Sequence, residues 1–405
     1  MTDTSVLPEK AAIPDHVPPE LVYDFDYIAD DGLKINPHAR IALLQKEAPP
    51  IFYTPRNGGH WAVQGYQQLL DMLRATDSFS SVELAIPAMK GEPKRIPLNI
   101  DPPDHAKYRR VLNHAFAPKA IMALESEIRE RSEELINRVL DKGGCEFVNT
   151  IAEPLPVLLF LKLAGMPAER MRDFRDWVST LFEEAASAER RAKVSKAIVD
   201  AMTETIQARQ EKRENDIVSR LIDSEVDGRN PTLEELQGYC VLLLIGGVDT
   251  VVNIMAYGIR HLAQDLPLQS YLREHPDRIA DMVEEVLRVY AITNPGRLVV
   301  KDTNYAGIEF LEGDRVLMMQ SAAGHDESFY DNAAKIDIDR KDKVHLSFGA
   351  GPHRCAGSHL ARLELRVFFE AFLRMVPEFR LDPDHPARFH GGASLNVNEL
   401  HLLWD

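Results

Sequence analysis

Apolar residues recur at helical spacing through most of the chain, whereas strand-like alternation is confined to short segments. The helical spacing predicts helices over residues 36–48, 120–141, 150–164, 170–186, 189–213 and 216–223, and a last long helix from about 356 to 376. Strands are predicted around an Asn-Gly-Gly turn within residues 50–64, and again at 297–300, 308–310 and 315–319. The pattern favours a single mainly α domain with a small β part over residues 1–405, with a proline-rich arm at about 1–20.

The longest apolar run predicts a central helix from Leu233 to about residue 264, with Thr232 and Glu235 forming a capping box. At 1.5 Å per residue such a helix is roughly 48 Å long, enough to cross the domain. Its middle, "LLLIGGVDTVVN" at 242–253, holds two glycines and then an Asp-Thr pair, where a buried helix should be most regular. The Asp would cost about 2.5 to 3.5 kcal/mol at the centre of a bilayer, so a buried soluble helix is favoured.

Composition narrows the class of protein. The 405 residues are 45% hydrophobic and 27% charged, as in soluble globular proteins, and the net charge of −16 argues against a nucleic-acid partner. Three widely spaced cysteines without a metal-binding spacing argue against a disulfide framework. The N-terminus lacks the basic-then-apolar order of a signal peptide. We therefore expect a cytoplasmic protein with no membrane segment.

The most specific motif is "FGAGPHRCAG", residues 348–357, which fits FxxGxxxCxG. Cys355 directly precedes the last helical pattern, so its sulfur would face free backbone N–H groups and the positive end of a helix, both of which lower a thiol pKa. Glycines let the backbone pass close to the sulfur, and Gly357 leaves room for a flat ligand. An inert buried cysteine would not explain these glycines, whereas a thiolate ligand to iron would.

With this motif the sequence resembles the cytochrome P450 family, in which the same loop supplies a thiolate to the iron of haem b, iron protoporphyrin IX. The resemblance covers nearly the whole chain. It implies the family's single-domain fold, a triangular prism of helices around the haem. It also implies Cys355 as the axial iron ligand, with Phe348, Gly351 and Gly357 completing the haem-binding loop.

Glu285 and Arg288 in "EEVLR" match the family's ExxR helix pair, and their spacing places both on one helix face. With Arg340 they would form the family's buried charge network behind the cysteine loop. A single ExxR match is more often a solvated helix pair, but its order and spacing relative to Cys355 favour the network here.

The resemblance also explains the irregular central helix, which in the family crosses the oxygen-binding face of the haem. Gly246 and Gly247 would remove side-chain bulk beside the iron. Thr250 can bond the carbonyl of Gly246 four residues earlier and hold the helix open. Asp249 and Thr250 are the implied catalytic pair, because reduced dioxygen needs two protons before its O–O bond splits. The alternative is a cap-like Asp and a core Thr in a bent helix.

Two haem propionates need cationic partners. The resemblance implies His105 and Arg109 from "DPPDHAKYRR", together with Arg297 and His353, as these contacts. His105 and Arg109 are four residues apart and so share a helix face. The alternative for each is an ordinary surface charge.

Within the family, "HVPPELVYDFDYI", "NGGHWAV" and the terminal "LLWD" are most similar to the bacterial camphor hydroxylase branch. That branch is soluble and takes electrons from a [2Fe–2S] ferredoxin, which a separate NADH-dependent flavoprotein reductase serves. The chain contains no P-loop, dinucleotide fingerprint or ferredoxin cysteine set, so these partners would be other proteins. Docking an acidic ferredoxin would need a local basic patch, for which the candidates are Lys107, Arg109, Arg110, Arg354 and Arg362.

The substrate expectation comes from residues aligned with the branch's pocket. Its camphor hydroxylase holds the substrate ketone with a tyrosine, but residues 80–99 here contain none, so camphor is disfavoured. We expect hydroxylation of a small hydrophobic terpenoid or norisoprenoid of ionone type. The pocket positions are Ala85, Leu242, Ile245, Thr293, Ala393 and Ser394.

Two other readings stay open at this point. One is a peroxide-driven haem-thiolate enzyme, and the other is a haem-thiolate sensor or binding protein without turnover. The Asp249–Thr250 pair argues against both, because neither would need a proton relay.

Overall fold

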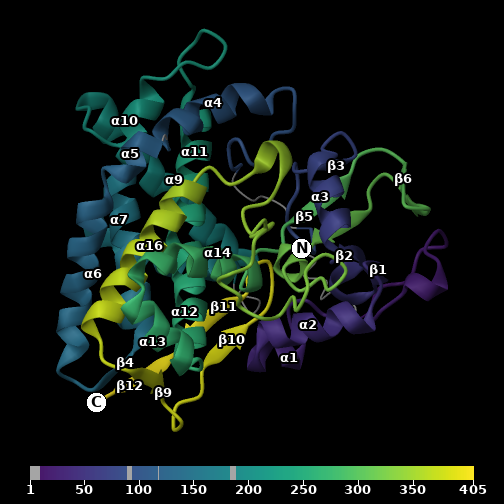
Figure 1. Cartoon of the computed structure of the whole chain (residues 1–405). Coiled ribbons are helices and arrows are strands. Elements are labelled where there is room, and N and C mark those ends of the chain that lie inside the picture. Colours follow the sequence, from purple (N-terminus) through teal and green to yellow (C-terminus); the bar gives the residue numbers. More distant parts are fainter. Residues whose placement is uncertain (1–9, 89–93, 117, 183–187) are drawn as a thin grey trace.

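The computed structural model of the chain describes residues 10–88, 94–116, 118–182 and 188–405. Helices make up most of it, and strands form small sheets (Figure 1). The helices are α1 (Asp31–Ile35), α2 (Pro37–Glu47), α3 (Tyr66–Arg74), α4 (His105–Ala115), α5 (Pro118–Met122), α6 (Glu125–Leu140), α7 (Pro154–Ala164), α8 (Met171–Phe182), α9 (Ala188–Glu211), α10 (Ile217–Ile222), α11 (Leu233–Val248), α12 (Thr250–Leu262), α13 (Leu266–Glu274), α14 (Ile279–Val289), α15 (Gln320–Ala323) and α16 (Ser358–Met375). The strands are β1 (Ile51–Thr54), β2 (His60–Val63), β3 (Phe79–Ser80), β4 (Gly144–Glu146), β5 (Gly296–Val299), β6 (Thr303–Tyr305), β7 (Ile308–Phe310), β8 (Arg315–Met318), β9 (Phe379–Leu381), β10 (Arg388–His390), β11 (Asn396–Glu399) and β12 (His401–Trp404).

The largest sheet has the strand order β1-β2-β8-β5-β3. The predicted hairpin at 50–64 is confirmed, with Ile51 paired antiparallel to Val63. Its turn places Asn57 and the two following glycines at positive φ, which explains the Asn-Gly-Gly sequence. The predicted strands at 297–300, 308–310 and 315–319 correspond to β5, β7 and β8.

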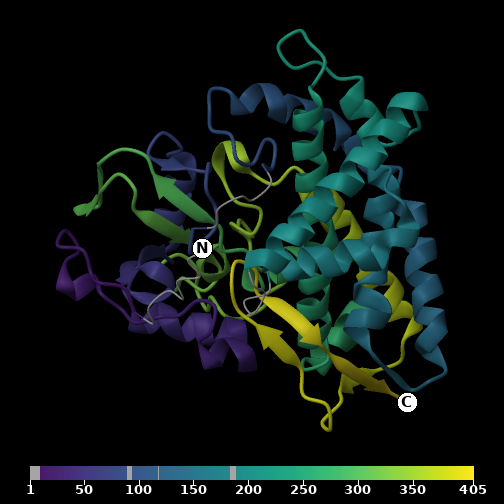
Figure 2. The ribbon, with the colours of Figure 1, turned by 180° about the vertical axis from the view of Figure 1, so that it is seen from behind.

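Strands near the C-terminus were not predicted. The strands β4, β12 and β9 form one sheet, and β10 pairs with β11. Each strand is three or four residues long, and β12 pairs with β4 from far earlier in the chain, so no local pattern marks them. Figure 2 shows these strands together at the end of the molecule where the C-terminus lies.

The helical part and the sheet-rich part lie side by side in both views (Figures 1 and 2). A large apolar core fills the helical part. Its members include Phe25 near the N-terminus and Trp404 near the C-terminus, so both ends of the chain contribute to it. A smaller core lies against the five-stranded sheet and includes Val17 of the proline-rich arm. The arm is fixed there by His16, whose Nε2 lies 2.9 Å from Asp314 Oδ2.

Most predicted helices are confirmed with trimmed ends. The helix predicted at 150–164 begins at Pro154 because a single π turn, Val148–Ala152, precedes it. The one predicted at 120–141 begins at Glu125, after the separate short helix α5. The last four residues of the prediction at 170–186 lie outside the described part of the chain.

The central helix forms with the predicted capping box of Thr232 and Glu235. It is divided at Asp249, where α11 ends and α12 begins, in agreement with the predicted local opening of the helix next to Thr250. By length and composition Leu233–Leu262 could cross a membrane, and it is the one such stretch among the described residues. Some 61% of its most apolar window is buried inside the protein, as in the core helix of a globular fold.

Candidate active site

The loop before α16 is shaped by its glycines and turns the Cys355 sulfur toward an open side. Cys355 N–H donates to the Phe348 carbonyl at 2.8 Å, which closes the loop. Gly351 has φ of 68°, and a Cβ there would lie 2.9 Å from the Leu73 carbonyl oxygen, so no other residue fits without strain. A Cβ on Gly357 would have a single neighbour within 4 Å, the Cys355 sulfur at 3.9 Å.

The charge state of Cys355 differs from the sequence prediction. The residue is exposed, yet the protein around the sulfur desolvates it, and this burial raises the pKa of the thiol. The Gly357 N–H and the guanidinium groups of Arg109, Arg354 and Arg362 oppose the rise without cancelling it. The predicted lowering of the thiol pKa is therefore wrong, because desolvation outweighs the helix end and the cations. A bound metal cation would still deprotonate the thiol on coordination.

The predicted ExxR network is present behind this loop. Arg288 Nε and Nη2 donate to the two Glu285 carboxylate oxygens at 2.7 and 2.8 Å, and both side chains have 0% exposure. Arg340 Nε donates to Glu285 Oε2 at 3.3 Å. Burial would raise the pKa of Glu285, but the bonds to Arg288, to the Asp337 N–H and the charge of Arg340 hold it below its usual value.

Arg288 also donates hydrogen bonds to three backbone carbonyls. Its Nη1 donates to the carbonyls of Gly324 and Ala333 at 2.7 and 2.6 Å, and Nη2 donates to the carbonyl of Lys335 at 2.7 Å. The network therefore fastens α14 to the chain that leads toward the cysteine loop.

A second contact joins α14 to the cysteine loop and was not predicted. Glu284 accepts two bonds from Arg362 of α16, at 2.6 and 2.9 Å, and Arg362 lies over the Phe348 ring at 4.7 Å. Ser347 Oγ donates to the Leu287 carbonyl. Arg362 thus connects α14 to the cysteine loop through Glu284 and Phe348. No sequence pattern predicts this role.

Three of the residues predicted to hold haem propionates lie in one buried cluster. The rings of His105 and His353 are 4.5 Å apart, and His353 Nε2 lies 3.6 Å from Asp101 Oδ1. Arg297 is 3% exposed and interacts electrostatically with the same Asp101. Burial lowers the pKa of Arg297 to about 10 and that of His105 to about 4.

These buried side chains lack enough hydrogen-bond partners. Within the described chain His105 Nε2, Arg297 Nε and both ring nitrogens of His353 are buried without a hydrogen-bond partner. Asp101 is one carboxylate for three such side chains, and Ser80 and the Ser81 N–H also bond it. Buried donors in this arrangement call for further anionic oxygens. The sequence did not predict Asp101 as part of this cluster. Its neighbours were expected to bind propionates, and no sequence pattern marks an acidic residue among them.

Arg109 lies at the edge of this cluster. Its Nε donates to Asn113 Oδ1 at 2.9 Å, and the charge of Cys355 acts on its guanidinium group. Arg109 therefore lies on α4 close enough to the cysteine loop to interact with Cys355, as a propionate contact would require.

The helix break confirms one predicted hydrogen bond and corrects the role of one glycine. Thr250 Oγ1 donates to the Gly246 carbonyl at 2.9 Å. Gly246 is exposed, and a Cβ there would meet no atom within 4 Å. A Cβ on Gly247 would instead lie 2.4 Å from the Phe160 ring of α7. The prediction that Gly247 removes side-chain bulk beside the iron is wrong, since Gly247 instead permits close packing of α11 on α7.

The two glycines give a paired stability prediction. Gly247→Ala should lower the free energy of unfolding by about 1 to 3 kcal/mol, because the new methyl group overlaps Phe160. In the haem-free protein, Gly246→Ala should raise it by up to about 1 kcal/mol through helix propensity, because space is available there. Urea unfolding of both variants tests this, and equal effects of the two substitutions would contradict the assignment.

Asp249 lies at the break and does not cap α12 with its side chain. Burial raises the pKa of its carboxyl group, while the charges of His390 and Arg175 and hydrogen bonds from Asn253 and Asn396 act in the opposite direction. A carboxyl group with a raised pKa can carry a proton closer to neutral pH.

The predicted pocket positions come partly together. Thr293 and Ser394 form a β-bridge, and the Ala393 carbonyl accepts the Asn294 N–H at 2.8 Å. Ser394 Oγ is buried without a partner among the described residues. Leu242 and Ile245 are half-buried on α11, one turn apart, and Ala85 bonds Arg315 of β8 through its carbonyl.

The predicted basic patch is smaller than the sequence indicates. Lys107 Nζ lies 3.0 Å from both Asp104 Oδ1 and Asp227 Oδ2, and Arg362 pairs with Glu284. Arg110 and Arg354 remain exposed.

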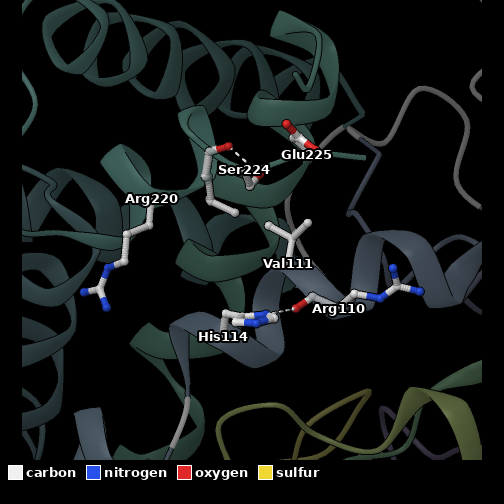
Figure 3. Close-up of a pocket in the computed structure, with 7 residues that line it drawn as sticks. Arg110, Val111, His114, Arg220, Ser224 and Glu225 are labelled. Carbon is white, nitrogen blue, oxygen red and sulfur yellow. Dashed lines mark hydrogen bonds between the residues drawn. The ribbon is translucent and has the colours of Figure 1, made fainter. Parts of the chain in front are cut away.

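Arg110 borders a surface pocket between α4 and α10 (Figure 3). In the close-up, the guanidinium groups of Arg110 and Arg220 point to opposite sides, and His114 Nδ1 contacts the Arg110 carbonyl at 3.0 Å. Val111 lies between the side chains of Arg110 and Arg220. The pocket contains neither Cys355 nor Asp249 and is distinct from the buried site.

Comparison with known proteins identifies the fold. A family model described as Cytochrome P450 matches residues 159–391, more than half of the chain. The chain belongs to the cytochrome P450 family. A relative named "Probable cytochrome P450 127A1", from Sinorhizobium fredii, is 32% identical over 402 residues, covering 97% of each chain. The solved structure of CYP101J2 has a TM-score of 0.89 at 30% identity over 98% of this chain and 100% of its own. That of CYP101C1 has a TM-score of 0.90 at 29% identity over 97% of this chain and 100% of its own.

These matches confirm the single-domain P450 fold and the resemblance to the bacterial camphor hydroxylase branch. Members of the P450 family bind haem b through a cysteine thiolate, and the chain is accordingly a haem-thiolate monooxygenase with haem b as cofactor. The residues present fit that group. The exposed thiol, the open space at Gly246 and the buried donors of His105, Arg297 and His353 without partners are what a flat iron porphyrin with two carboxylates requires.

Proposed function

We propose that the enzyme hydroxylates an unactivated C–H bond of a small hydrophobic substrate, with electrons from a separate [2Fe–2S] ferredoxin. One substrate molecule, one O2, two electrons and two protons give the alcohol and one water. Haem b supplies the dioxygen activation and the oxygen insertion. The observation that supports this proposal most is the helix break, where Thr250 Oγ1 bonds the Gly246 carbonyl beside the open space at Gly246.

Each predicted residue takes a place in this proposal. Cys355 Sγ would bind the iron, within the loop that Phe348, Gly351 and Gly357 shape. His105, Arg109, Arg297 and His353 would bind the propionates. Glu285, Arg288 and Arg340 would keep the loop in position from behind. The whole chain, residues 1–405, would act as one soluble, cytoplasmic unit.

The proton supply would depend on the helix break. Thr250 Oγ–H would turn from the Gly246 carbonyl to donate toward the open face, and Asp249 would replace the proton from the solvent side. Because burial raises the pKa of the Asp249 carboxyl group, it holds a proton for this transfer at a higher pH than a solvated aspartate would.

Removal of the Thr250 hydroxyl should uncouple electron use from product formation. In Thr250→Ala we expect NADH consumption to continue with the reductase and ferredoxin present, while product per NADH falls about tenfold or more and hydrogen peroxide accumulates. Thr250→Ser keeps the hydroxyl and serves as the control. Full coupling in the alanine variant would remove Thr250 from its role.

The substrate proposal rests on the small side chains at the predicted pocket positions. Ala85, Thr293, Ala393 and Ser394 are small, and Leu242 and Ile245 supply the apolar wall from α11. A terpenoid or norisoprenoid of ionone type suits such a lining, and camphor is disfavoured. A panel of these compounds should shift the haem absorption band and yield hydroxylated products with the partner proteins. Shifts without products would contradict this choice of substrate class.

The docking proposal now rests on fewer residues. Arg110 and Arg354 are exposed, and Arg109, which precedes Arg110 in the chain, is half-buried. Charge reversal of Arg110 should raise the apparent KM for an acidic ferredoxin at low salt, with little effect at high salt.

A further inference from the structure

A chain of amide side chains leads from the helix break to the hairpin of β10 and β11. Asn253, one turn after Asp249, donates from Nδ2 to the Asp249 carbonyl at 2.9 Å and to Asn396 Oδ1 at 3.2 Å. Its own Oδ1 accepts the Val397 N–H at 2.8 Å. Strand β11 is therefore fastened to the helix one turn after its break.

His390 completes this chain on the outer side. Its Nε2 lies 3.1 Å from Asn396 Nδ2, and its Nδ1 lies 2.8 Å from Asn398 Oδ1. Because Asn396 turns its oxygen to Asn253, its nitrogen donates to Nε2, and we assign the proton on the neutral ring to Nδ1. His390 is half-buried and Asn398 is exposed, so the imidazole lies between the interior and solvent.

Ring charge and amide orientation are linked by this geometry. A protonated His390 needs an acceptor at Nε2, and Asn396 can offer one only by turning its oxygen away from Asn253. That turn releases Asn253 Nδ2, which also bonds the Asp249 backbone. A change of charge on His390 thus reaches the helix break through two side chains.

When it is protonated, His390 also acts on Asp249 directly through its charge. The charged groups acting on the Asp249 carboxyl group are His390 from β10 and Arg175 from α8, while Asn253 and Asn396 are neutral. Arg175 is paired with Glu153 and stays charged. In the described part of the chain His390 forms no ion pair with a carboxylate, and its hydrogen bonds are to the neutral amides of Asn396 and Asn398.

We propose that His390 is a positioning residue that sets the protonation of Asp249, through its charge and through Asn396 and Asn253. This inference rests on the proposed function, because Asp249 must supply the two protons that each O2 consumes with two electrons from the redox partner. Those protons come from solvent, and His390 is where the network meets solvent.

An infrared titration tests the proposal without turnover. The C=O stretch of the protonated Asp249 carboxyl group is identified by its loss in Asp249→Asn and is followed against pH. His390→Gln cannot carry the positive charge of a protonated imidazole and should raise the Asp249 midpoint by about 1 pH unit. His390→Lys keeps the positive charge at every pH and should not raise it. His385→Gln, at an exposed histidine paired with Asp382, is the control and should change nothing.

Turnover measurements separate this inference from the proposed function. The limb of the pH–turnover profile that depends on Asp249 should move with the infrared midpoint in His390→Gln. An unmoved midpoint, an equal shift in the Gln and Lys variants, or a limb that stays in place would overturn the role of His390. Full turnover in Asp249→Asn would instead overturn the proton-supply role of Asp249, while the titration would still report the coupling of Asp249 to His390.

Discussion

Cys355→Ser is expected to abolish hydroxylation and to remove the thiolate signature from the haem spectrum. Serine occupies the same place in the loop, so the Phe348 bond and the glycine turn should persist, but its hydroxyl is a far weaker iron ligand than a thiolate. The expected loss of turnover is at least about a thousandfold, because the electron donation that favours O–O cleavage is gone.

Cys145→Ser is the matched control for that substitution. Cys145 lies in β4, and burial raises the pKa of its thiol to about 12, so it is a structural side chain. The control should keep both the spectrum and turnover. A Cys355→Ser protein with an unchanged spectrum would show that another side chain binds the iron.

Arg288→Ala is expected to lower the free energy of unfolding by about 3 to 5 kcal/mol, because it leaves Glu285 buried without its main partner. Three backbone carbonyls also lose their donor, which should loosen the chain leading to the cysteine loop. We therefore expect a low haem content in the purified variant, measured from the ratio of haem to protein absorbance alongside urea unfolding.

An exposed ion pair provides the control for Arg288. Arg131 contacts Glu134 at 2.8 Å with both side chains largely exposed, and Arg131→Ala should cost less than about 1 kcal/mol. If Arg288→Ala behaved like Arg131→Ala, the buried network would not be what stabilises this region.

Local spacing explains which parts of the site could be predicted from the sequence. Glu285 and Arg288 are three residues apart, and Thr250 and Gly246 are four apart, so helix geometry alone brings each pair together. The hairpin at 50–64 follows in the same way from its turn residues. In each case the partner lies within one turn of helix or one hairpin.

The features that sequence reasoning missed depend on contacts between distant segments. Gly247 meets Phe160 across two helices, Arg362 pairs with Glu284, and Asn396 joins Asn253 from 143 residues away. The raised pKa of Cys355 has the same origin, because desolvation depends on all the chain segments packed around the sulfur. The contact of Asn253 with Asp249 could have been predicted, since the two residues are four apart on a helix. The contacts that connect Asn253 to His390 through Asn396 could not, because they join distant segments.

The most direct test of the central claim is the absorption spectrum of the reduced protein with carbon monoxide. If Cys355 binds the haem iron as a thiolate, the Soret band should be strongly red-shifted, and the shift should be absent in Cys355→Ser and present in Cys145→Ser. A Soret band typical of histidine ligation in the unaltered protein, or a protein that takes up no haem, would contradict the assignment of Cys355 and the site built around it.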